Sequence, residues 1–224
     1  MIRILFQELL NKSGKSYKID SEIPNALILL TLQKRLIMLI RGIIKTRKKV
    51  FVGNNTKIYN SKNISFGKSV TIDKNCFIDG YAKQKIIFGD CVNIGAYSKL
   101  TSTSHLSKYG IGLQMGNNSA IGDFTHFGAS GGIEIGNDVI MGSYISFHSE
   151  NHNFSDNSKL IREQGTTNKG IKIGNNVWVG AKVTFLDGCK IGNNSVVAAG
   201  AVVNRGFPDN CVIGGIPAKI LKIL

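Results

Sequence analysis

The sequence holds little proline, few cysteines and few acidic residues, and each shortage narrows the class of protein. Among 224 residues there are 3 prolines, 4 cysteines, and 14 acidic against 28 basic residues. Cys76, Cys91, Cys189 and Cys211 lie far apart without a C-x-x-C pair, which argues against a disulfide framework or a zinc site. The N-terminus lacks the pattern of a signal peptide. We therefore expect a cytoplasmic protein.

Nucleotide-binding and nucleic-acid-binding motifs are missing as well. There is no G-x-x-x-x-G-K-[ST] loop and no G-x-G-x-x-G fingerprint after a strand, which argues against nucleoside triphosphates and dinucleotides. The net charge is +14, yet residues 1–50 carry 11 basic and 3 acidic residues and so hold most of the excess. Without a basic strand interleaved with aromatics, or a zinc finger, we expect no nucleic-acid partner.

Glycine, by contrast, is abundant, and it follows a six-residue repeat of large apolar residues. There are 26 glycines, and 13 of them stand directly after a position of the repeat. Grouped in threes, the positions are Val52, Ile58, Phe66; Ile72, Ile78, Phe88; Ile94, Leu100, Met115; Ile121, Phe127, Ile135; Met141, Phe147, Ile173; Val179, Phe185, Ile191; and Val197, Val203, Ile213.

The spacing of these positions predicts a three-sided coil. In this register 14 of the 20 steps are six residues long, and every longer step falls between the second and third member of a triplet. Short strands on three sides, with all insertions at one edge, satisfy this pattern. A single coil cannot bury its own apolar residues, so about seven coils must stack by parallel hydrogen bonding. We expect glycine and asparagine at the turns, because both tolerate left-handed backbone.

Four segments give a family resemblance over residues 50 to 224: SFHSENHNF (146–154), IREQG (161–165), IKIGNNVWVGA (171–181) and GGIPAKI (214–220). Together they resemble the hexapeptide-repeat acyltransferases, in the maltose and polysaccharide O-acetyltransferase branch. The resemblance implies an all-β, left-handed parallel β-helix, and a homotrimer with the active site between subunits. It also implies acetyl transfer from acetyl-CoA, with no metal, to a sugar hydroxyl of a bacterial surface polysaccharide. The expected domain spans 51–215 with an inserted loop at 148–170, followed by a tail at 216–224.

The first 50 residues form a separate basic segment. From Ile23 to Lys49 the pattern is that of an amphipathic helix. The expected apolar face holds Leu32, Leu36, Leu39 and Ile43, and the opposite face holds Lys34, Arg41, Lys45 and Lys48. The uninterrupted apolar stretch of this helix is too short to span a bilayer. The helix either caps the open end of the coil or, through residues 23–49, binds the anionic inner face of the cell membrane. The two roles are compatible.

The longest insertion contains the expected catalytic base. Between Phe147 and Ile173 the step exceeds six residues by 20, and long loops on repeat folds are usually functional. An imidazole can take a proton from a sugar hydroxyl and return it to the leaving thiol. Because NHNF resembles the family's catalytic segment, we assign this role to His152. Glu150 is a candidate to orient the imidazole, and His148 is a structural or substrate-facing alternative.

The resemblance also implies a donor site. It places Trp178 beside the thioester, and Gly180 and Ala198 along a groove for the pantetheine arm, with backbone N–H groups available for hydrogen bonding. It assigns the nucleotide phosphates to Arg205 and Lys219. The shorter insertion between Leu100 and Met115 shares an edge with the long one, so the two could wall the acceptor site.

Two readings from other classes stay open. A zinc hydratase of the carbonic anhydrase type could use His126, His148 and His152 as ligands at a subunit interface. A scaffold without catalysis would need neither the histidine-bearing loop nor a donor groove. His105 and His126 are expected to be surface or interface residues.

Overall fold

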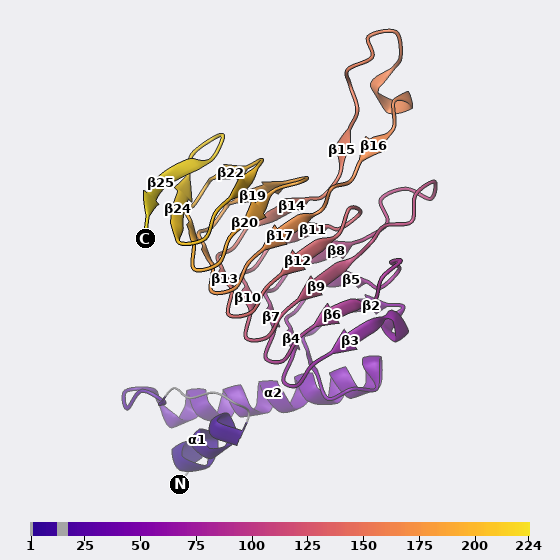
Figure 1. The fold of residues 1–224 in the computed structure, drawn as a ribbon. Helices are drawn as coiled ribbons and strands as arrows, with labels where there is room; N and C mark the ends of the chain where they lie inside the picture. Colours follow the sequence, from indigo (N-terminus) through magenta and orange to yellow (C-terminus); the bar gives the residue numbers. More distant parts are fainter. Residues whose placement is uncertain (1, 13–17) are drawn as a thin grey trace.

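A three-sided parallel coil makes up most of the chain (Figure 1). The computed structural model describes residues 2–12 and 18–224. Sheet A contains β1 (Phe51–Val52), β4 (Thr71–Ile72), β7 (Asn93–Ile94), β10 (Ala120–Ile121), β13 (Ile140–Met141), β18 (Trp178–Val179), β21 (Val196–Val197), β24 (Cys211–Gly214) and β25 (Lys219–Ile223). Sheet B contains β2 (Lys57–Tyr59), β5 (Phe77–Asp79), β8 (Lys99–Thr101), β11 (His126–Gly128), β14 (Ser146–His148), β19 (Thr184–Leu186) and β22 (Val202–Val203). Sheet C contains β3 (Ile64–Phe66), β6 (Ile86–Phe88), β9 (Leu113–Met115), β12 (Ile133–Ile135), β17 (Ile171–Ile173), β20 (Lys190–Ile191) and β23 (Gly206–Phe207).

The predicted register is confirmed except at its last position. First members of the triplets pair with one another in sheet A, second members in sheet B and third members in sheet C. Ile213, expected in sheet C, lies in sheet A opposite Val197, and Phe207 takes the place opposite Ile191. The step from Val203 to the next inward position, Phe207, is therefore shorter than six residues, and Ile213 begins an eighth turn of the coil.

The interior is a column of apolar side chains, one layer for each coil. In sheet B the rings of Phe127, Phe147 and Phe185 stack at 5.3 and 5.0 Å between centroids, and all three are fully buried. This column holds the strands on which the insertions are mounted, so it fixes where each insertion leaves the coil.

Asparagine serves the turns as predicted, but the glycines of the repeat serve a different purpose. Asn118, Asn176 and Asn194 adopt left-handed backbone at corresponding corners. The glycines that follow the repeat positions do not; a Cβ on Gly67 would lie 2.5 Å from the carbonyl carbon of Gly89 in the next coil. Glycine is needed at Gly67 because successive coils touch there, not because of its backbone angles.

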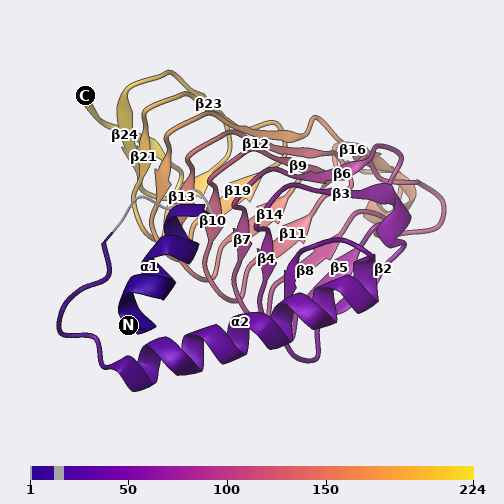
Figure 2. The same ribbon diagram turned by 90° about the horizontal axis from the view of Figure 1, so that it is seen from below.

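Two helices precede the coil: α1 (Ile2–Lys12) and α2 (Asn25–Thr46). Figure 2 shows α2 crossing the near end of the stack of coils. It packs on β1, with Ile28, Met38, Gly42 and Thr46 buried along one side of the helix, and Arg41 Nη1 donates a hydrogen bond to the carbonyl of Val52 at 2.8 Å. The predicted cap is confirmed.

The apolar face expected for this helix is only partly right. Leu32 and Leu39 are half-buried, but Leu36 and Ile43 are 58% and 44% exposed, because the buried row lies to one side of them. Gly42 decides which face packs inward, since a Cβ there would lie 1.8 Å from the Val50 carbonyl oxygen. Within residues 2–12 and 18–224, no helix combines the length and apolarity needed to cross a membrane.

The end of the chain is more ordered than the expected tail. β25 folds back antiparallel to β24, pairing Lys219 with Gly214. It covers the last coil, and Ala218 is buried at the turn.

Candidate active site

The long insertion folds into a hairpin that projects from the edge between sheets B and C (Figure 1). Its strands β15 (Asn151–His152) and β16 (Thr166–Thr167) are antiparallel, with His152 opposite Thr166. The side chain of Gln164 closes the loop beyond them: it accepts from the Asp156 N–H at 3.0 Å and donates to the carbonyls of Asp156 and Lys159. The IREQG segment therefore shapes the hairpin that carries His152.

A buried carboxylate holds the returning leg of the hairpin. Asp187 accepts the N–H groups of Lys169 and Gly170, each at 2.8 Å, just where the chain rejoins sheet C. Asp187 was not predicted, and a single aspartate after a strand gives no sequence signal for such a role.

The two insertions face one another across a cavity of about 640 Å³. Ser104, His105, Ser107 and Lys108 line it from the shorter insertion, and Glu150, His152, Arg162, Gly165 and Thr166 line it from the hairpin. The expectation that these insertions wall a common site is confirmed. His152 is exposed to the cavity, and among the described residues none hydrogen-bonds to its ring.

Glu150 does not touch His152, contrary to the expected orienting role. Its carboxylate accepts hydrogen bonds from Ser104 Oγ at 3.2 Å, Asn168 Nδ2 at 3.0 Å and Thr166 Oγ1 at 3.4 Å. Lys108 adds a second link, donating to Thr166 Oγ1 at 3.1 Å and to Asn168 Oδ1. Glu150 and Lys108 therefore tie the two walls together, and sequence reasoning missed Asn168, Thr166 and Lys108.

His148 lies outside this cavity. It is exposed on β14, and its ring lies 5.8 Å from the ring of His126 on β11. Burial, and then the charges of His148 and Lys99, hold the pKa of His126 below its usual value. His105 lies in the cavity wall, with Nδ1 2.8 Å from Ser107 Oγ.

The expected donor residues lie mostly on another side of the coil. Trp178 is on β18 of sheet A, 60% exposed and paired with Ile140 and Val196. The N–H groups of Gly180 and Ala198 donate to Val197 and Ile213. The expectation that these N–H groups are free donors is therefore wrong. Gly180 has no side chain and Ala198 has only a methyl group, so neither residue projects far from the corner of sheet A on which it lies.

The two expected phosphate contacts are separated. Lys219 begins β25 on sheet A and is exposed, while Arg205 lies in the turn from β22 to β23, at the same edge as the hairpin. The guanidinium of Arg205 sits 5.3 Å from the ring centre of Phe207. In a three-sided coil the edge between sheets B and C is opposite sheet A, so one copy does not bring His152 and Trp178 together.

A shared metal site is not formed by the three histidines of the zinc reading. His126 and His148 are neighbours on sheet B, whereas His152 is in the hairpin. In the part of the chain that the structure describes, no three His, Cys, Asp or Glu residues are placed to hold an ion.

Burial raises the thiol pKa of Cys76 to about 11 and of Cys189 to about 12, which is typical of inert structural cysteines.

Known proteins share this coil and its sequence pattern. The family model "Bacterial transferase hexapeptide (six repeats)" matches residues 170–205. The putative lipopolysaccharide biosynthesis O-acetyl transferase WbbJ of Escherichia coli (strain K12) is 28% identical over 199 residues, which cover 83% of this chain and 87% of that protein. The chain is therefore similar to the hexapeptide-repeat acetyltransferases over most of its length.

One further relative and one solved structure are also similar to this chain. A galactoside O-acetyltransferase of Lactococcus lactis subsp. lactis is 37% identical over 91 residues, covering 40% of this chain and 42% of that relative, so the match spans less than half of its length. The solved structure of AntD, an N-acyltransferase from Bacillus cereus in complex with dTDP and 3-hydroxybutyryl-CoA, superposes with a TM-score of 0.54 at 20% identity over 79% of this chain and 80% of that one. The fold of this acetyltransferase is therefore a left-handed parallel β-helix.

Proposed function

We propose that this protein transfers an acetyl group from acetyl-CoA to a hydroxyl of a saccharide acceptor, with His152 as the general base. The observation that carries the proposal is the position of His152, exposed in a cavity of about 640 Å³ between two insertions. Serine and threonine hydroxyls, the carboxylate of Glu150 and the cations Lys108 and Arg162 line the cavity with the imidazole. Such a wall suits an acceptor that presents many hydroxyls.

The chemistry needs no enzyme nucleophile. The neutral imidazole of His152 takes the proton of the acceptor hydroxyl while its oxygen attacks the thioester carbonyl. The tetrahedral intermediate expels the CoA thiolate, which receives that proton from the imidazolium. An ester forms as the thioester breaks, so atoms and charge balance. The oxyanion donor must come from groups other than the N–H of Gly180 or Ala198, because both are occupied.

The donor site is proposed to lie between copies in a homotrimer. The insertion edge of one copy supplies His152 and Arg205, and sheet A of its neighbour supplies Trp178 and Lys219. Three observations favour this arrangement: Trp178 is 60% exposed, Lys219 is exposed on the same sheet A, and the edge opposite sheet A carries His152. Gly180 and Ala198 would let the pantetheine arm pass close to the coil.

The acceptor is proposed to be a sugar of a bacterial surface polysaccharide. WbbJ is named for lipopolysaccharide biosynthesis and the Lactococcus relative for galactosides, and both names favour a glycan hydroxyl. We place the enzyme in the cytoplasm, at the inner face of the membrane where lipid-linked glycans are built. The scaffold reading loses support because the histidine-bearing cavity is formed, and a zinc site within one copy loses support because the three histidines are not gathered.

Thiol release from acetyl-CoA, measured with a panel of hexoses, N-acetylhexosamines and sialic acids, tests this function. We expect acceptor-dependent release that His152→Ala lowers by at least about a hundredfold, since a general base contributes ~10²–10⁴. His148→Ala, an exposed histidine outside the cavity, is the matched control and should keep most of the activity. Undiminished turnover by His152→Ala with a normal melting temperature would refute the assignment.

A further inference from the structure

One face of α2 is a broad, exposed apolar surface. The exposed fractions of its members range from 44% to 76%. They are Leu29, Leu30, Leu36, Ile37, Ile40, Ile43 and Ile44. At about 100° per residue they form one contiguous face. We call it the α2 apolar face.

This face points away from the rest of the protein. The buried residues Ile28, Met38 and Gly42 lie on the other side of the helix, where Gly42 meets Val50 at the start of the first coil. α1 packs beside the N-terminal half of α2, where Phe6 and Leu10 line a small apolar cavity with Leu27 and Ile28. Neither the coil nor α1 covers the α2 apolar face. Seven adjoining leucine and isoleucine side chains exceed what a free surface normally exposes, and such patches mark interaction sites.

The surroundings of the face are strongly basic. α2 contains four cations and no acidic residue, and Arg47, Lys48 and Lys49, all exposed, follow directly. Lys34 lies at one border of the face, 64% exposed at its side chain, with a long 4.0 Å contact to Asp73. An anionic surface would therefore be attracted to this end of the molecule.

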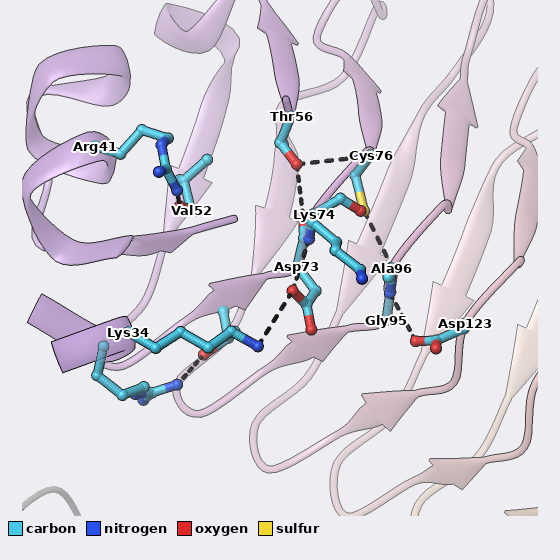
Figure 3. A network of polar contacts seen from close by, with 12 residues as sticks. Lys34, Arg41, Val52, Thr56, Asp73, Lys74, Cys76, Gly95, Ala96 and Asp123 are labelled. Atoms are coloured by element: carbon cyan, nitrogen blue, oxygen red, sulfur yellow. Dashed lines mark hydrogen bonds and ion pairs between the residues drawn. The ribbon is translucent and has the colours of Figure 1, made fainter. Parts of the chain in front are cut away.

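A groove beside the face combines both properties. It has a volume of about 330 Å³ between α2 and the first two coils. Leu30, Ile37 and Met38 line it, together with Lys34, Arg41 and Lys74. Figure 3 shows Lys34 and Arg41 on the helix and Lys74 on the facing coil. Apolar walls next to cations fit an acyl chain and a phosphate headgroup.

We infer that the α2 apolar face docks the protein on an anionic phospholipid bilayer, with α2 lying in the interface and the coil standing end-on. Interfacial helices combine an apolar face with flanking lysine and arginine in this way. A second copy is a poorer occupant, because face-to-face pairing would bring two sets of cations together. The inference does not rest on the proposed reaction, since it uses only α2 and its surroundings.

The docked orientation has a geometric consequence for the cavity. β14, from which the hairpin leaves, is the fifth strand of sheet B counted from the α2 end. Four coil spacings of about 4.8 Å place it ~19 Å above the capped end. A glycan projecting from the bilayer would reach such a site, whereas the lipid itself would not.

Flotation of the full-length protein with vesicles tests the inference. We expect binding to phosphatidylcholine vesicles that contain about one third phosphatidylglycerol, and weak binding to phosphatidylcholine alone, because each lysine near an anionic surface favours binding severalfold. The double variant Ile37→Glu/Ile44→Glu should bind at least about tenfold more weakly. Leu221→Glu/Ile223→Glu is the matched control: these side chains on β25 are 64% and 61% exposed, and it should bind like the wild type.

A charge variant separates attraction from apolar contact. Lys45→Gln/Lys48→Gln/Lys49→Gln should weaken binding to the anionic vesicles by about a hundredfold and leave the melting temperature unchanged. Wild-type protein that fails to float at low salt would overturn the inference. So would a change of oligomeric state in Ile37→Glu/Ile44→Glu, measured by light scattering, because the face would then lie between copies.

Discussion

His152 is positioned by backbone pairing and by the loop that Gln164 closes, not by a carboxylate beside its ring. Glu150, the expected partner, bonds Ser104 and Asn168 and so joins the two walls of the cavity. The position of His152 in a projecting insertion could be predicted from the sequence, because that insertion interrupts the repeat. The partner of Glu150 could not be predicted, because it depends on which hydroxyl and amide groups two distant loops bring together.

Lys219 provides a test of the donor site at the scale of one residue. If the proposed assembly is right, Lys219→Gln removes a charge that meets the CoA phosphates. The KM for acetyl-CoA should then rise severalfold while kcat changes little, because the interaction is uniform along the reaction. Lys222→Gln, on the same strand, is the control. An unchanged KM in steady-state kinetics would rule out the phosphate contact.

His126 gives the fold a pH dependence. Its pKa is lowered in the folded protein, chiefly by burial and further by His148 and Lys99, so the folded state binds this proton less tightly than the unfolded chain. The stabilising contribution is complete above the unfolded pKa of about 6.5 and is lost as the pH falls through the lower folded pKa. We expect the melting temperature to fall more steeply below pH ~6.5 in the wild type than in His126→Asn. An identical decline in both proteins would contradict this prediction, and His105→Asn serves as the control.

At the scale of elements, the repeated strands of the coil could be predicted from the sequence, whereas its shortened last turn and strand β25 could not. Each strand of the coil repeats one pattern, so spacing alone assigned nearly every inward residue. The short last side at Phe207 was missed, because a step shorter than six residues was not allowed for. β25 was missed because its pairing is antiparallel and falls outside the repeat.

The orientation of α2 illustrates the same limit. Periodicity placed Leu36 and Ile43 inward, yet the face that contains Gly42 is the one that packs on the coil. α2 carries apolar residues over most of its circumference, so apolarity does not select a face. The close approach of Gly42 to the Val50 carbonyl selects the buried face. This is a tertiary contact, and the periodicity of the helix does not reveal it.

Gly42 therefore offers a prediction about α2. Gly42→Ala would normally favour a helix, but here the added Cβ would lie 1.8 Å from the Val50 oxygen. We expect a net loss of about 1–3 kcal/mol in the free energy of unfolding, as for other overpacked sites. Gly206→Ala is the control, because its Cβ would meet nothing closer than Lys190 at 3.9 Å. Chemical denaturation followed by circular dichroism measures both, and equal stability of the two variants would contradict the packing assigned to α2.

At the scale of the whole molecule, the residues proposed for the base and for the donor lie on opposite sides of the single chain. The edge between sheets B and C carries His152, and sheet A carries Trp178. This separation follows from the predicted register, because Trp178 precedes a first member of a triplet and the insertion with His152 lies between a second and a third member. The resemblance to homotrimeric enzymes supplied the expectation of a shared site, and the fold now requires that expectation if both residues act on one substrate.

Activity of mixed assemblies tests this claim most directly. His152→Ala and Trp178→Glu, each expected to be nearly inactive alone, are co-expressed and purified together through different tags. If each site takes His152 from one subunit and Trp178 from its neighbour, every trimer that holds both variants has one intact site out of three, so acetyl-CoA thiol release should recover to about a third of the wild-type level. Mixed assemblies that stay as inactive as the separate variants would show that no site is shared between copies.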